Sequence, residues 1–230
     1  MPAHFNEQLE QLRGEVARVA SKVQEVLEFA CDVAMQADAH LVPEVKALDR
    51  LIDADEVRIE GAAIDLIALH QPAASDLRLL MTVIKVNSDL ERIADCSKNI
   101  AGRSKVLARS DGSRPPRDLR ILADSVTELL RDVIKAYNLS DTGLAAKVVA
   151  SDEVIDALYQ QIVAETTLQM ESGKLAAARG LAYVMIAKNL ERIGDHCTNI
   201  AEDVLYVSSG AIRRHQRREI ADAESEGRQD

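Results

Sequence analysis

The chain states one motif twice, and this internal repeat limits the folds that it can adopt. Residues 189–201 read Asn-Leu-Glu-Arg-Ile-Gly-Asp-His-Cys-Thr-Asn-Ile-Ala. Residues 89–101, 100 positions earlier, read Asp-Leu-Glu-Arg-Ile-Ala-Asp-Cys-Ser-Lys-Asn-Ile-Ala. The copies share Leu-Glu-Arg-Ile-x-Asp and Asn-Ile-Ala, and each places a Glu and an Asp four residues apart. Residues four apart lie on one face of a helix, so the motif predicts two equivalent helices with an acidic face.

A second set of acidic residues repeats upstream of each motif. Its three members are separated by 11 and then by 4 residues: Asp38, Asp49 and Asp53 in the first half, and Asp141, Asp152 and Asp156 in the second. The shift is 103 here, so the second half has three fewer residues before its motif. We therefore interpret the halves as two copies of one structural unit.

Apolar residues within each half recur at intervals of three and four, which indicates amphipathic helices. Breaks are marked by Pro43, Pro72, Gly173 and, most clearly, the Ser-Asp-Gly-Ser-Arg-Pro-Pro cluster over 110–116. We expect six long helices over 5–38, 43–70, from a Ser75-Asp76 cap to 108, 117–138, 142–171 and 174–208. The predicted fold class is all-α, with two pseudo-symmetric three-helix bundles over 1–110 and 111–209. The charged segment over 210–230 has few apolar residues and is predicted to be a disordered tail.

Composition excludes several classes of function. A net charge of −10 argues against a protein that binds nucleic acid by neutralising phosphates, and the scarcity of aromatic residues (3%, with no Trp) argues against base stacking. The sequence begins without a basic and apolar leader, and no stretch approaches the ~18 apolar residues that a membrane span needs. We expect a cytoplasmic protein whose Cys31, Cys96 and Cys197 are small buried residues in a reducing compartment.

The repeated acids continue apolar stripes on their own helices. A helical wheel places the Glu-x-x-x-Asp pairs on the faces of Leu77, Met81 and Ile84 in the first half, and of Ala177, Leu181 and Val184 in the second. The upstream pairs likewise share a face with Ile64 and Ile67 in the first half, and with Tyr159, Val163 and Met170 in the second. We therefore expect these stripes to pack in the core and to turn each acidic pair toward a neighbouring helix, ~8–10 Å away.

Four partly buried carboxylates per half cannot all remain ionised without compensation. Protons, the neighbouring Arg92 and Arg192, or bound cations can each supply it. Clustered oxygen ligands suit hard or borderline cations, so we hypothesise one carboxylate-rich metal site per half. Asn99 and Asn199 are either additional ligands or ordinary polar helix positions, and His196 has no counterpart in the first half.

Three classes of protein remain open on the residues alone: a metal-binding regulatory adaptor, a carboxylate-bridged metalloenzyme, and a structural helical module whose acids pair with arginines. The sequence contains neither a Gly-x-x-x-x-Gly-Lys-Ser/Thr loop nor a His-Glu-x-x-His motif. A ferritin-like di-iron centre would need Glu-x-x-His, and the motif here carries Gly194 or Ala94 at that position.

The doubled Leu-Glu-Arg-Ile-Gly/Ala-Asp motif, the doubled Asp-x-x-x-Asp and the segment Gln-Pro-Ala-Ala-Ser-Asp-Leu-Arg over 71–78 resemble the PhoU family. The resemblance covers about residues 5–208. It implies two three-helix bundles whose acidic motifs line multinuclear metal clusters of iron or of another ion such as Mn, Mg, Zn or Ca. Carried over residue by residue, it implies these metal ligands: Asp49, Asp53, Glu91, Asp95, Asp152, Asp156, Glu191 and Asp195.

The resemblance also implies regulation without catalysis. PhoU proteins link the ATPase of the phosphate ABC transporter to a membrane sensor histidine kinase, restrain the phosphate-starvation response when phosphate is plentiful, and are commonly homodimers. Such a protein would be cytoplasmic or held at the inner face of the membrane through its partners. The chain departs from the family pattern at Ala94, where Gly is usual, and in the tail over 210–230, to which we assign no role.

Overall fold

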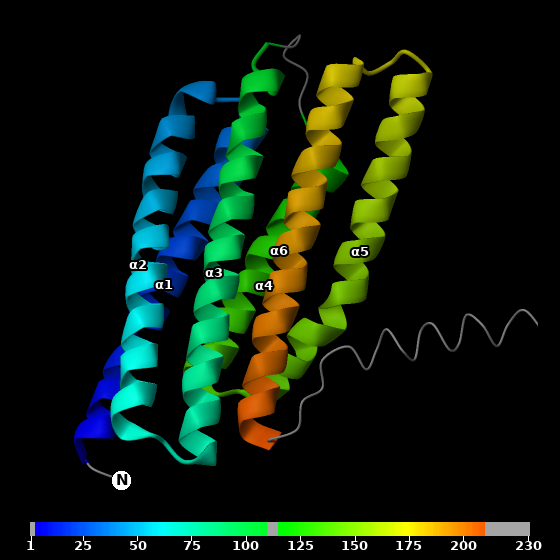
Figure 1. Cartoon of the computed structure of the whole chain (residues 1–230). Helices are drawn as coiled ribbons and strands as arrows, with labels where there is room; N and C mark the ends of the chain where they lie inside the picture. The colour runs from blue at the N-terminus through cyan, green and yellow to red at the C-terminus, as the bar shows by residue number, and fades with distance from the viewer. Residues whose placement is uncertain (1–2, 110–114, 210–230) are drawn as a thin grey trace, which may run out of the picture.

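The structure, a computed structural model, describes residues 3–109 and 115–209 of the chain. Within these residues it contains long helices and no strands (Figure 1). The elements are α1 (Ala3–Met35), the 3-10 helix η1 (Ala39–Leu41), α2 (Val42–His70), α3 (Ala74–Leu107), α4 (Arg117–Leu139), α5 (Thr142–Glu171) and α6 (Ala177–Ser209). The prediction of an all-α fold with six long helices is confirmed. The domain boundary near residue 110 and the tail over 210–230 fall in segments outside the described residues.

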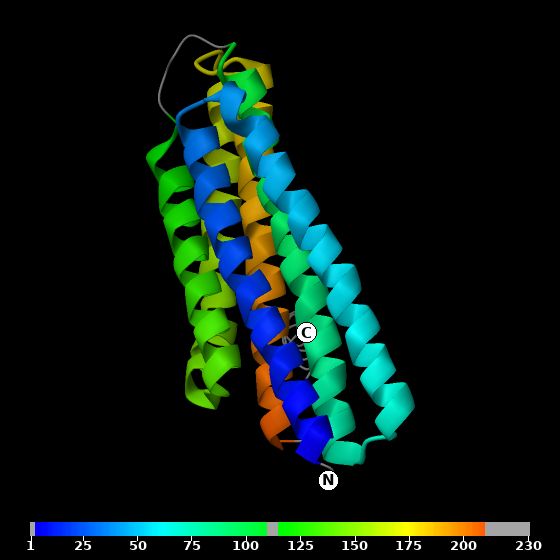
Figure 2. The same ribbon diagram turned by 90° about the vertical axis from the view of Figure 1, so that its left-hand side faces the viewer.

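The two three-helix units join side by side through α3 and α6, which form the most extensive helix–helix contact of the structure. Helices α2, α3, α6 and α5 form one layer in that order, and α1 and α4 cover it from behind (Figure 1). Figure 2 shows the helices running along a common long axis, with α1 packed beside α4. Because α1 and α4 cover only one side of the layer, its other side is open.

The core reflects the duplication. The apolar members of the two motifs are all at most 1% exposed: Leu90, Ile93 and Ile100 on α3, and Leu190, Ile193 and Ile200 on α6. Ala94 is buried within α3 and does not interrupt that helix, as expected for an Ala in a helix. At the equivalent Gly194, an added Cβ would lie 3.1 Å from Cγ2 of Ile155, so the smaller residue allows α5 to approach α6 closely.

Two helix ends differ from the sequence prediction for identifiable reasons. Helix α1 ends at Met35 because Ala37 adopts a left-handed conformation (φ 54°) and the N–H of Asp38 donates to the carbonyl of Val33 at 3.0 Å. Helix α3 begins at Ala74 without a side-chain cap, so Ser75 lies in its first turn and the expected cap is wrong.

Asp38 and Asp141 each cap the helix that follows them. The Asp38 carboxylate accepts from the backbone N–H of His40 at 3.0 Å, and the Asp141 carboxylate accepts from that of Leu144 at 3.0 Å. These are the N-cap interactions that Asp commonly makes. Both residues therefore shape the chain at equivalent points of the two halves and are not part of either acidic cluster.

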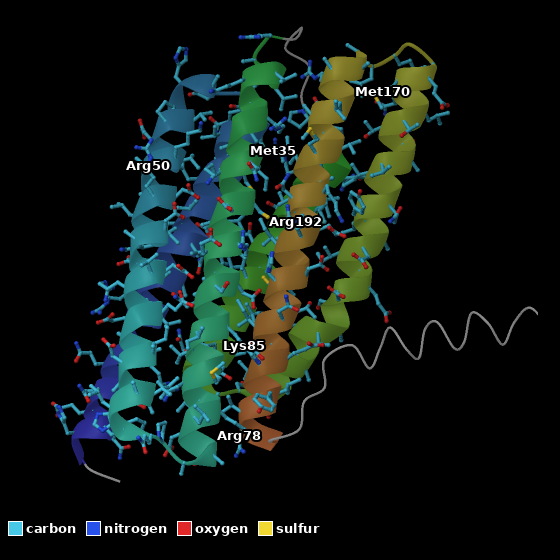
Figure 3. The ribbon with its side chains drawn as sticks, in the orientation of Figure 1. Met35, Arg50, Arg78, Lys85, Met170 and Arg192 are labelled. Atoms are coloured by element: carbon cyan, nitrogen blue, oxygen red, sulfur yellow. The ribbon has the colours of Figure 1, made fainter. Side chains whose placement is uncertain are left out.

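Polar side chains also cross the α3–α6 contact. Nζ of Lys85, which is labelled in Figure 3, donates to Oδ1 of Asp203 at 3.2 Å, and Asp203 is buried at 2% exposure. Farther along, Nδ1 of His196 lies 2.9 Å from Oδ1 of Asp89, which also accepts from Nδ2 of Asn199 at 3.4 Å. His196 and Asn199 thus contact the opposite half of the protein.

No helix within the described ranges has the length and apolar character that crossing a membrane requires.

Candidate metal centres

The first acidic cluster lies where α2 packs beside α3. Asp49 and Asp53 are on α2, and Glu91 and Asp95 are on α3. Asp49 is buried at 3% exposure, and the other three are half-buried. Burial, followed by the nearby Asp95, raises the pKa of Glu91 above its usual value, and Asp53 contributes in the same direction. The structure therefore brings the four predicted residues of the first half into one electrostatic neighbourhood.

An ammonium group lies inside this first cluster. Nζ of Lys98 donates to Oδ2 of Asp49 at 2.7 Å and also to Oδ1 of Asp95, so one lysine joins α2 to α3. Burial alone would lower the pKa of Lys98, but its bonds to the two carboxylates raise it above the usual lysine value. The other oxygen of Asp49, Oδ1, is buried without a hydrogen-bond partner. Burial raises the pKa of Asp49, and Lys98 opposes that shift.

The second cluster lies at the equivalent α5–α6 contact. Asp152 and Asp156 are on α5, and Glu191 and Asp195 are on α6. Asp152 and Glu191 are half-buried, whereas Asp156 and Asp195 are exposed. Partial burial, followed by the charges of Glu191, Asp152 and Asp156, raises the pKa of Asp195 to about 6. The second predicted quartet thus also forms one electrostatic unit.

Two neighbouring polar residues complete the second cluster. Oγ1 of Thr198 donates to Oδ1 of Asp152 at 3.1 Å. Nζ of Lys188 lies 2.6 Å from both carboxylate oxygens of Glu191 and 5.2 Å from the ring centroid of Tyr159. Lys188 therefore pairs with Glu191 on its own helix, while a neutral hydroxyl contacts Asp152.

The helix faces that carry these clusters are open, contrary to the sequence prediction. The apolar residues that continue the acidic stripes are substantially exposed: Ile64 (52%), Leu77 (38%), Met81 (40%) and Leu181 (57%). The expectation that these stripes pack in the core is wrong for these four residues, because α1 and α4 cover only the opposite side of the α2–α3–α6–α5 layer, whereas Ile67, Ile84 and Tyr159 are partly buried against the core. As a result, ions can reach both clusters from solvent.

The arginines of the motifs do not provide the main compensation for the acids. Arg92 is exposed and places Nε 3.4 Å from Oε2 of Glu91, with Nη1 4.0 Å from Oδ2 of Asp95. Exposed ion pairs of this kind contribute about 0–1 kcal/mol to stability. Arg192, labelled on α6 in Figure 3, is likewise exposed. The purely arginine-paired structural module is therefore the weakest of the three readings.

The donor chemistry of the second cluster fits a hard cation, since four carboxylates and a hydroxyl supply oxygen alone. In the part of the chain that the structure describes, no three His, Cys, Asp or Glu side chains lie close enough together to hold a metal ion as placed. The assignment of the eight acids as ligands therefore stays a prediction, and the first cluster, which holds Lys98, fits it less well.

The sequence did not lead us to expect that Lys98, Lys188 and Thr198 would contact the acids. These residues occupy two equivalent positions, which hold Ser88 and Lys98 in the first half, and Lys188 and Thr198 in the second. Each half thus has one lysine near its acids, but at opposite ends of the motif. The signal was present in the alignment of the two motifs, where Lys98 lies three residues after Asp95 and so shares its face.

The raised pKa of Asp195 predicts a pH-dependent effect of Asp195→Asn in metal-free protein. The folded-state pKa of about 6 exceeds the ordinary aspartate pKa of 3.8, so ionisation of Asp195 opposes folding. This penalty is absent below the pKa of Asp195 in the unfolded chain. It grows as the pH rises from that value through the folded-state pKa and is constant above it. Urea unfolding with a chelator present should therefore find the variant more stable than wild type at about pH 8 and equal to it at about pH 3. A variant that is less stable at the higher pH would contradict this electrostatic account.

A duplicated three-helix unit, with an acidic pair on two helices of each copy, defines a class of all-α protein with paired acidic clusters. The family model of the PhoU domain matches this chain twice, over residues 16–104 and 119–204, once in each half. The chain belongs to the PhoU family.

Relatives and solved structures agree with this assignment. The phosphate-specific transport system accessory protein PhoU homolog of Aquifex aeolicus is 35% identical over 91% of this chain and 95% of the relative. The homolog of Pseudomonas putida is 32% identical over 97% of this chain and 88% of the relative. The crystal structure of PhoU from Pseudomonas aeruginosa superposes with a TM-score of 0.85 at 32% identity, covering 90% of this chain and 100% of that one.

Proposed function

We propose that this chain is an accessory regulator of phosphate uptake and phosphate signalling. It would connect the ATPase of a phosphate ABC transporter to a membrane sensor histidine kinase and restrain the phosphate-starvation response when phosphate is plentiful. The observation that carries the proposal is the match of the PhoU domain to both halves. The names of the relatives, which are accessory proteins of the phosphate-specific transport system, support it.

In this proposal the protein is a cytoplasmic adaptor with no catalytic chemistry and no nucleic-acid partner, and it acts as a homodimer at the inner face of the membrane. Its open layer offers apolar side chains for such contacts, including Leu77 and Met81 on α3 and Leu181 and Met185 on α6. These residues flank the acidic clusters along the same helices. The state of a cluster would therefore bear directly on the surface that meets a partner.

The proposal includes metal binding by the acidic clusters. Asp152 and Asp156 from α5 would hold a divalent or trivalent ion, or a multinuclear group of ions, together with Glu191 and Asp195 from α6. The bound ion would supply positive charge that offsets the mutual repulsion of the carboxylates. The chain's own residues then do the structural work, since two helices contribute ligands and their relative positions become fixed.

Deletion of the gene tests the regulatory part of the proposal. A reporter fused to a phosphate-starvation promoter should be active in the deletion strain even in high phosphate, and the wild-type gene should restore its repression. Membrane pull-downs with the tagged protein in high and low phosphate should recover the transporter ATPase and the kinase. A deletion strain with unchanged, phosphate-responsive reporter activity would overturn the proposal.

A further inference from the structure

The two acidic clusters are equivalent by repeat, but they differ at one position that reaches into the cluster. Lys98 and Thr198 occupy the same place in the two motifs, 100 residues apart. Each contacts the first member of the Asp-x-x-x-Asp pair on the neighbouring helix, Asp49 in one half and the equivalent Asp152 in the other. This motif position therefore supplies a cation of the protein itself in one half and a neutral hydroxyl in the other.

Lys98 makes contacts that a metal ion would otherwise make. Its ammonium bridges Asp49 of α2 and Asp95 of α3, and both of these belong to the predicted ligand set. The Asp49 side chain is 4% exposed and that of Lys98 is 27% exposed, so solvent screens this bridge only partly. A second cation placed among the same carboxylates would be repelled by the ammonium at short range.

Thr198 places no positive charge at the equivalent position of the second cluster. Its hydroxyl donates to one oxygen of Asp152 and adds no charge. The lysine of this half, Lys188, contacts Glu191 from the edge, and its side chain is 47% exposed. The Glu191 side chain is only 13% exposed, but this pair joins two residues of α6, whereas Lys98 bridges α2 and α3. Lys188 is therefore a weaker obstacle than Lys98 to a cation shared between two helices.

We infer that Lys98 replaces a metal ion in the first acidic cluster, so that metal binding by this chain is confined to the second cluster, where Thr198 occupies the equivalent position. The first half is then held together permanently by its own lysine, and only the second half responds to metal supply. This inference rests on the metal-binding part of the proposed function and adds an asymmetry that the repeat alone does not indicate.

The test measures Mn²⁺ bound per chain by elemental analysis after dialysis, with affinities from titration calorimetry. Wild-type protein should keep its metal content when Glu91→Gln and Asp95→Asn remove acids of the first cluster. Lys98→Thr should raise the content to about twice that of wild type, because two equivalent carboxylate clusters are then available. The added Mn²⁺ should disappear again when Glu91→Gln and Asp95→Asn are combined with Lys98→Thr. Thr198→Lys should lower binding to background.

Three further proteins make the result specific. Lys98→Arg keeps the positive charge and should bind no more Mn²⁺ than wild type. Lys98→Gln removes the charge with a longer polar side chain and should gain Mn²⁺ if Lys98→Thr folds poorly. Lys135→Thr on α4, an exposed lysine away from both clusters, makes the same chemical change and should leave the content unchanged. Circular dichroism confirms folding, and Mn²⁺ should raise the melting temperature of Lys98→Thr more than that of wild type.

The outcomes distinguish a failure of the inference about Lys98 from a failure of the proposed metal binding. If Glu91→Gln and Asp95→Asn lower the metal content of the wild-type chain, both clusters load and the inference is overturned while metal binding stands. If Lys98→Thr and Lys98→Gln both fold but gain no Mn²⁺, the inference is overturned as well. Absence of binding in every protein, wild type included, overturns the metal-binding part of the proposed function and the inference together.

Discussion

The double variant Glu191→Gln, Asp195→Asn is expected to lose Mn²⁺ affinity by at least about 100-fold, since changes to residues that merely support metal ligands already cost about 10–100-fold. The two substitutions keep the size of the side chains and remove both charges that α6 contributes to the second cluster. Asp152 and Asp156 of α5 would then remain as the only charged ligands proposed for this cluster. Titration calorimetry on metal-depleted protein measures the effect.

The matched control is Glu153→Gln on α5. Glu153 is exposed and adjacent in sequence to Asp152, but about 100° around the helix from it. It reports the effect of removing one negative charge from the same helix without removing a proposed ligand. We expect its Mn²⁺ affinity to stay within a factor of about two, as screening weakens distant surface charges. Equal affinities for the wild type, the control and the double variant would mean that the second cluster does not bind the ion.

Ile193→Ala is expected to lower the free energy of unfolding by about 2–5 kcal/mol, the range for such truncations in packed cores. Ile193 is 0% exposed on α6, the helix that packs against α3, α4 and α5. Truncation loses apolar burial and leaves a cavity that rigid helices on several sides cannot easily close. Urea unfolding of metal-free protein, followed by circular dichroism at 222 nm, measures the change.

Ile121→Ala on α4 provides the comparison, because Ile121 is 39% exposed. Substitutions at such surface positions usually change stability by no more than about 0.5 kcal/mol. Carrying out both measurements with a chelator separates core packing from any contribution of bound metal. Similar losses of unfolding free energy for the two variants would contradict the expectation that Ile193 contributes more to stability than Ile121.

The sequence predicted the helices well because two independent signals agreed. Apolar periodicity marked their interiors, and Pro43, Pro72 and Gly173 marked their ends. The repeat then fixed the equivalence of the halves without any structural information. Helix ends were less predictable. Helix α1 ends at a left-handed Ala37, whereas Gly or Asn is the residue that usually indicates such an end.

The candidate sites were only partly predictable. A helical wheel correctly placed each acidic pair on one face, and the structure brings the α2 and α3 acids together and the α5 and α6 acids together. The wheel could not show whether another helix covers that face, so Leu77 and Leu181 were expected in the core and are exposed. Nor could it show that the long side chain of Lys98 turns toward Asp49 on the neighbouring helix.

Anomalous X-ray scattering from crystals of the metal-depleted protein soaked in Mn²⁺, recorded on both sides of the manganese absorption edge, locates the bound ions. We expect an anomalous peak among Asp152, Asp156, Glu191 and Asp195 and none beside Lys98. A map in which every manganese peak lies away from both acidic clusters would contradict this expectation.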